Sequence, residues 1–270
     1  MAPMRMTVIG TGYLGATHAA CMAELGHEVL GIDVDQAKID ALKNGRVPFF
    51  EPGLPEVLER NISNGRLSFT TDYEEAAQFA NVHFIGVGTP QQRGSYAADT
   101  TYVEAAVDSL VPHLEGDHVI LGKSTVPVGT AAALQERADR LAEQAGKGAS
   151  VEIAWNPEFL REGYAVQDTI TPDRIVLGVN TQNEGTSTAE AVAREVYAEP
   201  LNNDTPFIVT DLQTAELVKV SANAFLATKI SFINAVSEVC ENVGADVTQL
   251  ADAIGHDDRI GRKFLGAGLG

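Results

Sequence analysis

Apolar residues in the first two thirds of the chain occur in short runs rich in β-branched side chains, and helical stretches lie between most of them. This alternation predicts an α/β fold in which a parallel sheet is covered by helices. The expected strands are Met6–Ile9, Glu28–Ile32, Leu67–Thr70, Val82–Val87, His118–Gly122, Val151–Ala154, Ile175–Leu177 and Phe207–Val209.

The pattern changes after Val209. Between Asp211 and Val243 there is no glycine or proline, and Asp211 and Gly244 are suitable cap residues. A helix of this length spans about 50 Å, which is longer than a compact domain buries. We therefore predict an α/β domain over residues 1–209. Residues 210–270 are expected to begin a second, helical domain whose long helix is its spine or a dimer interface.

Composition and charge narrow the class of protein. The 270 residues carry a formal net charge of −18, which argues against nucleic acid or an anionic membrane as partner. The first apolar run, Met6–Ile9, is too short for a signal or membrane segment. Cys21 and Cys240 make no disulfide framework and suit a reducing compartment. These features predict a soluble cytoplasmic protein.

A glycine-rich turn follows the first predicted strand. In the stretch VIGTGYLG, residues Gly10, Gly12 and Gly15 have G-x-G-x-x-G spacing and open a helix. This context predicts a Rossmann-type, doubly wound parallel sheet whose first turn holds a dinucleotide pyrophosphate. Asp33 ends the second strand, where a carboxylate binds a ribose 2′-hydroxyl, and Val34 follows it instead of an arginine, which favours NAD over NADP.

We predict no metal site. His18 and Cys21 are three residues apart, but they lie on the packed stripe of the first helix and are expected to be core residues. The other histidines, cysteines and acids do not have the spacing of metal ligands.

Three further segments are expected at the carboxyl edge of the sheet. GVGTP (86–90) and KSTVPVGT (123–130) end strands with threonine hydroxyls, although each alone is also ordinary turn chemistry. In NPEFLREG (156–163), Asn156 is a natural helix cap, so we predict a helix that presents Glu158 and Glu162 on one face. Spacing alone leaves open whether these carboxylates do chemistry or complement the helix dipole.

The stretch LVKVSANAFLA (217–227) is apolar on nearly all sides, which predicts a buried helix segment. Lys219 and Asn223 interrupt it four residues apart. We expect them to face the crevice and to stabilise an alkoxide or oxyanion, with a solvated helix edge as the alternative.

These motifs, with VPFFEPGLPEVL and RIGRKFLGAGLG, occur in the same order as in the UDP-glucose/GDP-mannose dehydrogenase family. The resemblance covers the whole chain and is strongest to the members that act on UDP-glucose. It implies an NAD domain, a central domain built on a dimerising helix, and a C-terminal nucleotide-sugar domain. It also implies oxidation of the sugar C6 alcohol to a carboxylate, giving UDP-glucuronate, with two NAD and a cysteine thioester.

The resemblance assigns roles to individual residues. It implies that NAD is bound by Gly10, Thr11, Gly12, Tyr13, Leu14, Gly15, Asp33, Lys38, Val87, Thr89, Pro90, Ser124, Thr125 and Glu162. It implies that the nucleotide sugar meets Glu158, Phe159, Leu160, Lys219, Asn223, Arg259, Phe264, Leu265, Gly266 and Gly268, within a stretch that runs to Gly270. Glu158 is then the base for thioester hydrolysis, Thr125 organises the catalytic water, and Lys219 with Asn223 steadies the oxyanion.

In the family, the last glycine run continues into a segment with the nucleophilic cysteine, and the sequence given stops before it. We therefore expect a partial chain that binds NAD and does not complete the oxidation. Two alternatives stay open: a two-electron 3-hydroxyacid-type NAD dehydrogenase, and a non-catalytic NAD-binding module that dimerises. The sequence does not distinguish UDP-glucose from GDP-mannose or UDP-N-acetylmannosamine as substrate.

Overall fold

The computed structural model describes residues 3–181 and 187–269. It divides into two compact units, Met1–Leu217 and Val218–Gly270, and the division falls inside one long helix. The domain boundary expected at 209/210 stays a prediction.

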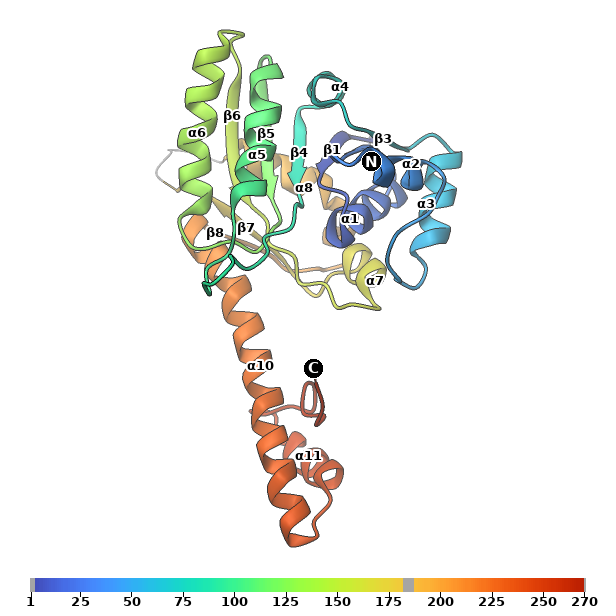
Figure 1. Ribbon diagram of the computed structural model, residues 1–270, viewed down its shortest axis with the longest axis vertical. Helices are drawn as coiled ribbons and strands as arrows, with labels where there is room; N and C mark the ends of the chain where they lie inside the picture. Colours follow the sequence, from blue (N-terminus) through green and yellow to red (C-terminus); the bar gives the residue numbers. More distant parts are fainter. Residues whose placement is uncertain (1–2, 182–186, 270) are drawn as a thin grey trace. The chain divides into compact units, whose positions relative to one another are not determined.

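The first unit is built on an eight-stranded sheet with the strand order β3-β2-β1-β4-β5-β6-β7-β8 (Figure 1). All eight predicted strands are present, with ends shifted by up to two residues. They are β1 Arg5–Ile9, β2 Glu28–Ile32, β3 Leu67–Thr70, β4 Val82–Ile85, β5 Asp117–Gly122, β6 Ser150–Trp155, β7 Ile175–Val179 and β8 Phe207–Asp211. The Rossmann-type doubly wound fold is thereby confirmed.

One strand pair departs from the predicted parallel sheet, because β6 and β7 are antiparallel. A parallel partner needs a crossover connection that carries the chain back along the sheet. Residues 156–174 contain only the short helix α7 (Ala165–Ile170) and make no such crossover. The segment after Trp155 therefore stays at the carboxyl edge of the sheet, where ligands bind in this fold.

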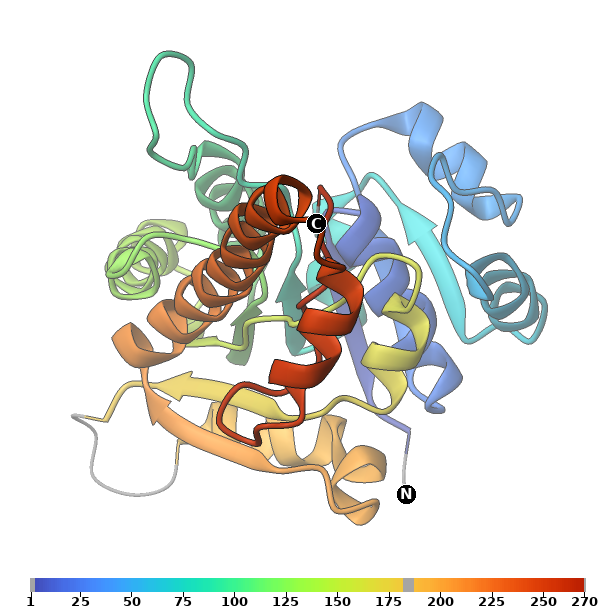
Figure 2. The ribbon, with the colours of Figure 1, turned by 90° about the horizontal axis from the view of Figure 1, so that it is seen from below.

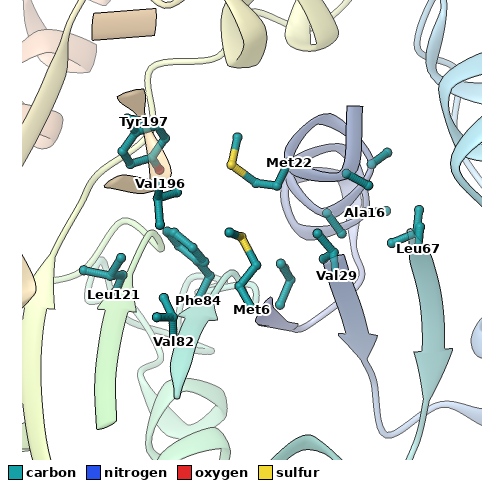
Figure 3. Packing of buried hydrophobic residues seen from close by; sticks show 14 of the residues in the cluster. Met6, Ala16, Met22, Val29, Leu67, Val82, Phe84, Leu121, Val196 and Tyr197 are labelled. Carbon is teal, nitrogen blue, oxygen red and sulfur yellow. The ribbon is translucent and has the colours of Figure 1, made fainter. Parts of the chain in front are cut away.

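Helices cover both faces of the sheet. The remaining helices of this unit are α1 Tyr13–Glu24, α2 Gln36–Lys43, α3 Leu54–Ser63, α4 Tyr73–Phe79, α5 Thr101–Leu110, the 3₁₀ helix η1 Val111–His113, α6 Thr130–Ala145, α8 Thr188–Val196 and α9 Ala198–Asn202. One core cluster joins the alternate strand residues of one face to helices α1, α2, α3 and α8. Figure 3 shows Met6 and Phe84 of neighbouring strands directed toward Met22 of α1 and toward Tyr197.

The second unit contains most of α10 (Leu212–Val243) and the helix α11 (Val247–Gly255). The predicted helix ends are confirmed, since Asp211 accepts a hydrogen bond from the Thr214 N–H at 2.7 Å and Gly244 has a left-handed φ of 72°. Both α11 and the C-terminal segment lie beside α10 (Figures 1 and 2).

The expectation that 217–227 is a buried helix segment is wrong for this chain. Leu217, Val220 and Phe225 are exposed, Phe225 with 66% of its surface. Apolar composition on every side indicates burial only when other protein surrounds the helix, and this chain leaves that surface uncovered.

Candidate functional site

The three positions in the turn after β1 require glycine for different structural reasons. A Cβ at Gly10, which has φ +88°, would lie 2.6 Å from Val87, and one at Gly15 would lie 1.7 Å from the Gly10 carbonyl oxygen. Packing of strand and helix therefore requires both glycines. At Gly12 a Cβ would meet no atom within 4 Å. No contact with the described residues explains this glycine, but the close approach of a bound pyrophosphate does.

The helix that begins at this turn presents its N-terminus for an anion. Gly12 is the N-cap of α1, and no side chain caps the helix there. The first N–H groups of a helix have no intrahelical partner and carry partial positive charge. The open space at Gly12 and these N–H groups fit the diphosphate of NAD.

Asp33 is fixed at the end of β2. Its buried carboxylate accepts hydrogen bonds from the Thr11 N–H at 2.8 Å and from the Lys38 ammonium at 2.7 Å. Burial acts to raise the pKa of Asp33, but these bonds outweigh it and the net pKa is lowered. Asp33 is therefore an anionic acceptor beside the phosphate turn, as a ribose hydroxyl requires, and the structure brings Thr11, Asp33 and Lys38 together.

The segments after β4 and β5 are tied to each other. The Ser124 hydroxyl donates to the Val87 carbonyl at 2.7 Å, and the Thr89 hydroxyl donates to the Thr125 carbonyl at 2.6 Å. Gly86 N–H in turn donates to the Ile9 carbonyl at 2.8 Å, next to the glycine turn. The predicted cofactor residues of three strand ends thus form one connected edge.

The helix predicted over 156–163 is absent, which corrects the expectation of two carboxylates on one helix face. Asn156 does not cap a helix: its amide donates to the Val176 carbonyl at 2.8 Å, and its Oδ1 accepts from the buried Lys123 ammonium at 3.0 Å. The side chain that would have started a helix is therefore used inside the core. Residues 156–164 form a loop, in which the Glu158 carboxylate accepts from the Leu160 N–H at 2.6 Å.

Two other residues of this loop, Phe159 and Arg161, make contacts with side chains outside it. The Arg174 guanidinium lies 3.9 Å from the ring centroid of Phe159, a cation–π contact. Arg161 pairs with Asp168 at 2.5 Å, and Glu162, the predicted NAD contact, is exposed.

Sequence reasoning missed Glu51, although it lies in the quoted motif VPFFEPGLPEVL. The carboxylate is 2% exposed and accepts three hydrogen bonds, from the Tyr13 hydroxyl at 2.5 Å and from the N–H groups of Gly163 and Ala165 at 2.8 Å each. Burial, followed by the bond to Glu51, raises the pKa of Tyr13, which keeps its hydroxyl proton on the donor. An acid between two phenylalanines and a Pro-Gly pair was the available signal.

Glu216 was missed as well. This buried residue of the second turn of α10 accepts hydrogen bonds from the N–H groups of Gly129 and Ala131, each at 2.7 Å, and so caps α6. Burial raises its pKa, and the backbone N–H groups offset part of that rise. No local spacing in the sequence connects Glu216 to residues so far away.

The second unit holds a cavity of about 430 Å³ against α10. It is lined by Asn223, Leu226, Ala227, Ile230, Ser231, Asn234 and Leu269. Of the residues predicted here, the structure places Asn223 in this lining beside the C-terminal segment, and it buries Lys219 to 6% exposure. Whether Lys219 and Asn223 meet Glu158 stays a prediction, because they belong to the other unit.

The C-terminal segment is attached to α10 at two points. The Lys229 ammonium donates to the carbonyls of Ile260 at 3.0 Å and Lys263 at 2.6 Å. The Asn234 amide pairs with both the N–H and the carbonyl of Gly268 at 2.8 Å. Between these points Phe264 has φ +64°, a conformation that bulky residues seldom adopt and that the attachments maintain.

The remaining residues predicted to bind the substrate differ in exposure. Arg259 is exposed and pairs with Asp257 at 2.6 Å. Leu265 is buried, and Gly266 and Gly268 are exposed. Gly270 lies outside the described residues.

Both cysteines are buried as free thiols, and burial raises the pKa of Cys21 to about 12. Among residues 3–181 and 187–269, no group of three histidines, cysteines or acids could hold a metal ion. Within the same ranges, no helix has the length and apolar character to cross a membrane.

Two family profiles match the chain. Residues 4–201 match the NAD binding domain of the UDP-glucose/GDP-mannose dehydrogenase family, and residues 213–270 match the central domain of that family. The cofactor assigned to the first unit is therefore NAD.

Individual relatives agree with the profiles. A UDP-glucose 6-dehydrogenase of Rhizobium meliloti is 45% identical over 267 residues, which cover 99% of this chain and 60% of the relative. The structure of a UDP-glucose dehydrogenase from Pyrobaculum islandicum superposes with a TM-score of 0.90 at 41% identity, and the match covers 100% of this chain and 60% of that one. The chain thus spans about 60% of the length of these relatives.

The fold extends to more distant proteins. A 3-hydroxyisobutyrate dehydrogenase of Mycobacterium tuberculosis has a TM-score of 0.63 at 17% identity, with 95% of this chain and 72% of that chain covered. At this identity the likeness is one of fold alone.

Proposed function

The chain belongs to the UDP-glucose/GDP-mannose dehydrogenase family, and on that premise we propose that it forms the NAD-binding and central helical part of an enzyme that oxidises UDP-glucose to UDP-glucuronate. The observation that carries the proposal is the uncovered face of Gly12 at the uncapped start of α1, beside the anionic Asp33. The names of the relatives support UDP-glucose as the sugar nucleotide.

NAD would be held at the carboxyl edge of the sheet. The N–H groups after Gly12 would bind the pyrophosphate, and Asp33 with Lys38 would bind the adenosine ribose. The linked segments around Val87, Thr89 and Pro90 and around Ser124 and Thr125 would line the nicotinamide side. When bound, NAD accepts a hydride from the sugar carbon.

The residues around the sugar would handle protons and charge. Oxidation of the C6 alcohol releases one hydride and one proton, and oxidation of a thiohemiacetal to a thioester releases a second pair. Lys219 and Asn223 would stabilise the oxyanion at C6, and Glu158 would take a proton from the water, oriented by Thr125, that hydrolyses the thioester. Arg259 and the segment Phe264–Gly268 would hold the nucleotide sugar.

The thioester needs an accessible thiolate, and neither cysteine of the chain provides one. Cys21 and Cys240 are buried, and the Cys21 thiol has a raised pKa. We therefore propose that the 270 residues bind NAD but do not by themselves complete the four-electron oxidation.

A second copy of the chain is the proposed partner of α10. Phe225, Phe232 and Val239 recur every seven residues on this helix and are 66%, 53% and 60% exposed. A seven-residue apolar stripe is the pattern that packs two helices together. This supports a homodimer through residues 211–243. The two free cysteines support a cytoplasmic location.

The test is calorimetric titration of the purified chain with NAD and NADP, together with absorbance at 340 nm in the presence of UDP-glucose. We expect binding of NAD, at least about tenfold weaker binding of NADP, and no steady production of NADH. Absence of NAD binding would overturn the proposed cofactor site. Steady turnover would overturn the proposal that these residues do not by themselves complete the four-electron oxidation.

The same two measurements with other compounds decide between the open alternatives. Calorimetric binding of GDP-mannose and UDP-N-acetylmannosamine, compared with that of UDP-glucose, tests the choice of sugar. Production of NADH from 3-hydroxyisobutyrate tests the two-electron alternative. NAD binding and dimerisation with no turnover, even when the part of a relative that this chain does not match is supplied in trans, would favour a non-catalytic module.

A further inference from the structure

Glu51 lies between two parts of the proposed cofactor site that are distant in the sequence. One partner, Tyr13, is the first residue of α1 and follows the open glycine of the phosphate turn. Of the other partners, Gly163 follows directly on Glu162, and Ala165 begins α7. One buried carboxylate therefore connects the turn after β1 to the loop after β6.

The contacts leave this carboxylate little freedom. Its Oε2 accepts from both the Tyr13 hydroxyl and the Gly163 N–H, and its Oε1 accepts from the Ala165 N–H. The Tyr13 ring is also held by an edge-on contact with Phe49, with ring centroids 5.0 Å apart. Hydrogen bonds to an ionised acceptor are stronger than neutral ones, and buried donors that lose their acceptor keep the full desolvation cost.

We infer that Glu51 is a positioning residue that clamps the phosphate turn to the 158–165 loop and so sets the place of Glu162 and Glu158 relative to bound NAD. The inference rests on the proposed function, since it assigns these two segments to the same cofactor. Glu51 itself touches neither cofactor nor sugar in this role.

A glutamine at position 51 breaks the clamp with little change in volume. Its carbonyl oxygen still accepts from one backbone N–H, while its NH₂ group faces another N–H donor. Glu51→Gln is therefore expected to weaken NAD binding about tenfold, the change produced when a buried donor loses its partner. Tyr13→Phe removes only the bond to the turn and should weaken binding by a few fold.

Glu152 offers a matched control. Its carboxylate accepts from the Ser187 hydroxyl and from the Ala189 N–H at 3.1 Å, at the start of α8, and neither partner belongs to the proposed cofactor site. Glu152→Gln should lower the melting temperature to a similar extent as Glu51→Gln, yet leave the Kd for NAD within twofold of the wild type.

The experiment measures the Kd for NAD and the melting temperature of the 270-residue wild type, the three single variants and the Tyr13→Phe/Glu51→Gln double variant. The inference holds if Glu51→Gln weakens NAD binding much more than Glu152→Gln, and if its effect shrinks in the Tyr13→Phe background. It is overturned if Glu51→Gln loses stability but binds NAD within twofold of the wild type.

Two further outcomes are distinguishable. Failure of the wild type to bind NAD would overturn the proposed function and the inference with it. If Glu51→Gln does not fold, Tyr13→Phe alone decides, because unchanged NAD binding in that variant would contradict the clamp.

Discussion

The phosphate turn of the first unit and the helix α10 beyond Leu217 differ in where their partners come from. At the turn, each site-bearing residue is fixed by the same chain: Gly15 by the Gly10 carbonyl, Asp33 by Thr11 and Lys38, and Tyr13 by Glu51. Along α10, large apolar side chains such as Phe225 and Phe232 remain exposed. The comparison shows that the residues around the turn find their partners within the first unit, whereas large apolar side chains of α10 in the second unit stay exposed, as the proposed pairing with a second copy requires.

The largest effect is expected from Gly15→Ala. The added Cβ would lie 1.7 Å from a backbone oxygen that cannot move without breaking the turn. We expect a loss of at least about 3 kcal/mol in the free energy of unfolding, measured by urea denaturation. Wild-type stability in this variant would show that the backbone of the phosphate turn can shift to make room for a side chain at position 15.

Gly12→Ala is the matched variant with the opposite outcome. Its Cβ would meet no atom of residues 3–181 and 187–269 within 4 Å, and its φ of −71° suits alanine, so stability should change by no more than about 1 kcal/mol. The methyl group would occupy the space proposed for the pyrophosphate, and the Kd for NAD should rise about a hundredfold by calorimetry. Undiminished NAD binding would remove the main support for the cofactor site.

Phe232→Glu tests the helical side of the comparison. A charge in the seven-residue stripe should weaken self-association by about 2 kcal/mol, measured by analytical ultracentrifugation, with little effect on NAD binding. Glu241→Ala, two residues beyond Val239 and on the opposite side of the helix, is the control and should associate like the wild type. A wild type that is monomeric at high concentration would contradict the proposed dimer.

Acid sensitivity should reside in the first unit. Burial lowers the pKa of His83 to about 3, and its ring bonds to Thr7 and His118 in the sheet. The unfolded chain binds a proton below about pH 6.5 but the folded chain does not, so this contribution to stability is full above pH 6.5 and is lost as the pH falls toward 3. The loss is about 1.4 kcal/mol per pH unit.

His83→Gln should make the dependence of unfolding free energy on pH shallower by about one proton between pH 6 and 4.5. An unchanged slope would show that His83 is protonated in the folded protein. The effect is the smallest of the four at neutral pH.

The strands and the phosphate turn could be predicted from the sequence because each depends on the residue pattern of a short stretch of chain. Short apolar runs rich in β-branched side chains predicted all eight strands, and the glycine spacing after β1 predicted the turn. The loop over 156–164 was mispredicted because Asn156, a good cap by local rules, bonds instead to Lys123 and Val176. Glu51 and Glu216 were missed because their partners lie 38 to 114 and 85 to 87 residues away.

The capping of α6 by Glu216 has a practical consequence for dissecting this protein. The same end of α10 also supplies Leu212, which is buried, and Ala215, which is packed against Gly178. A fragment cut at the predicted boundary of residue 209 would lose all three and leave a helix start and part of β8 without their support. An expressible cofactor-binding fragment should therefore keep the chain through Leu217. The start of α10 then covers the end of the sheet and caps α6, although the predicted boundary assigns it to the next domain.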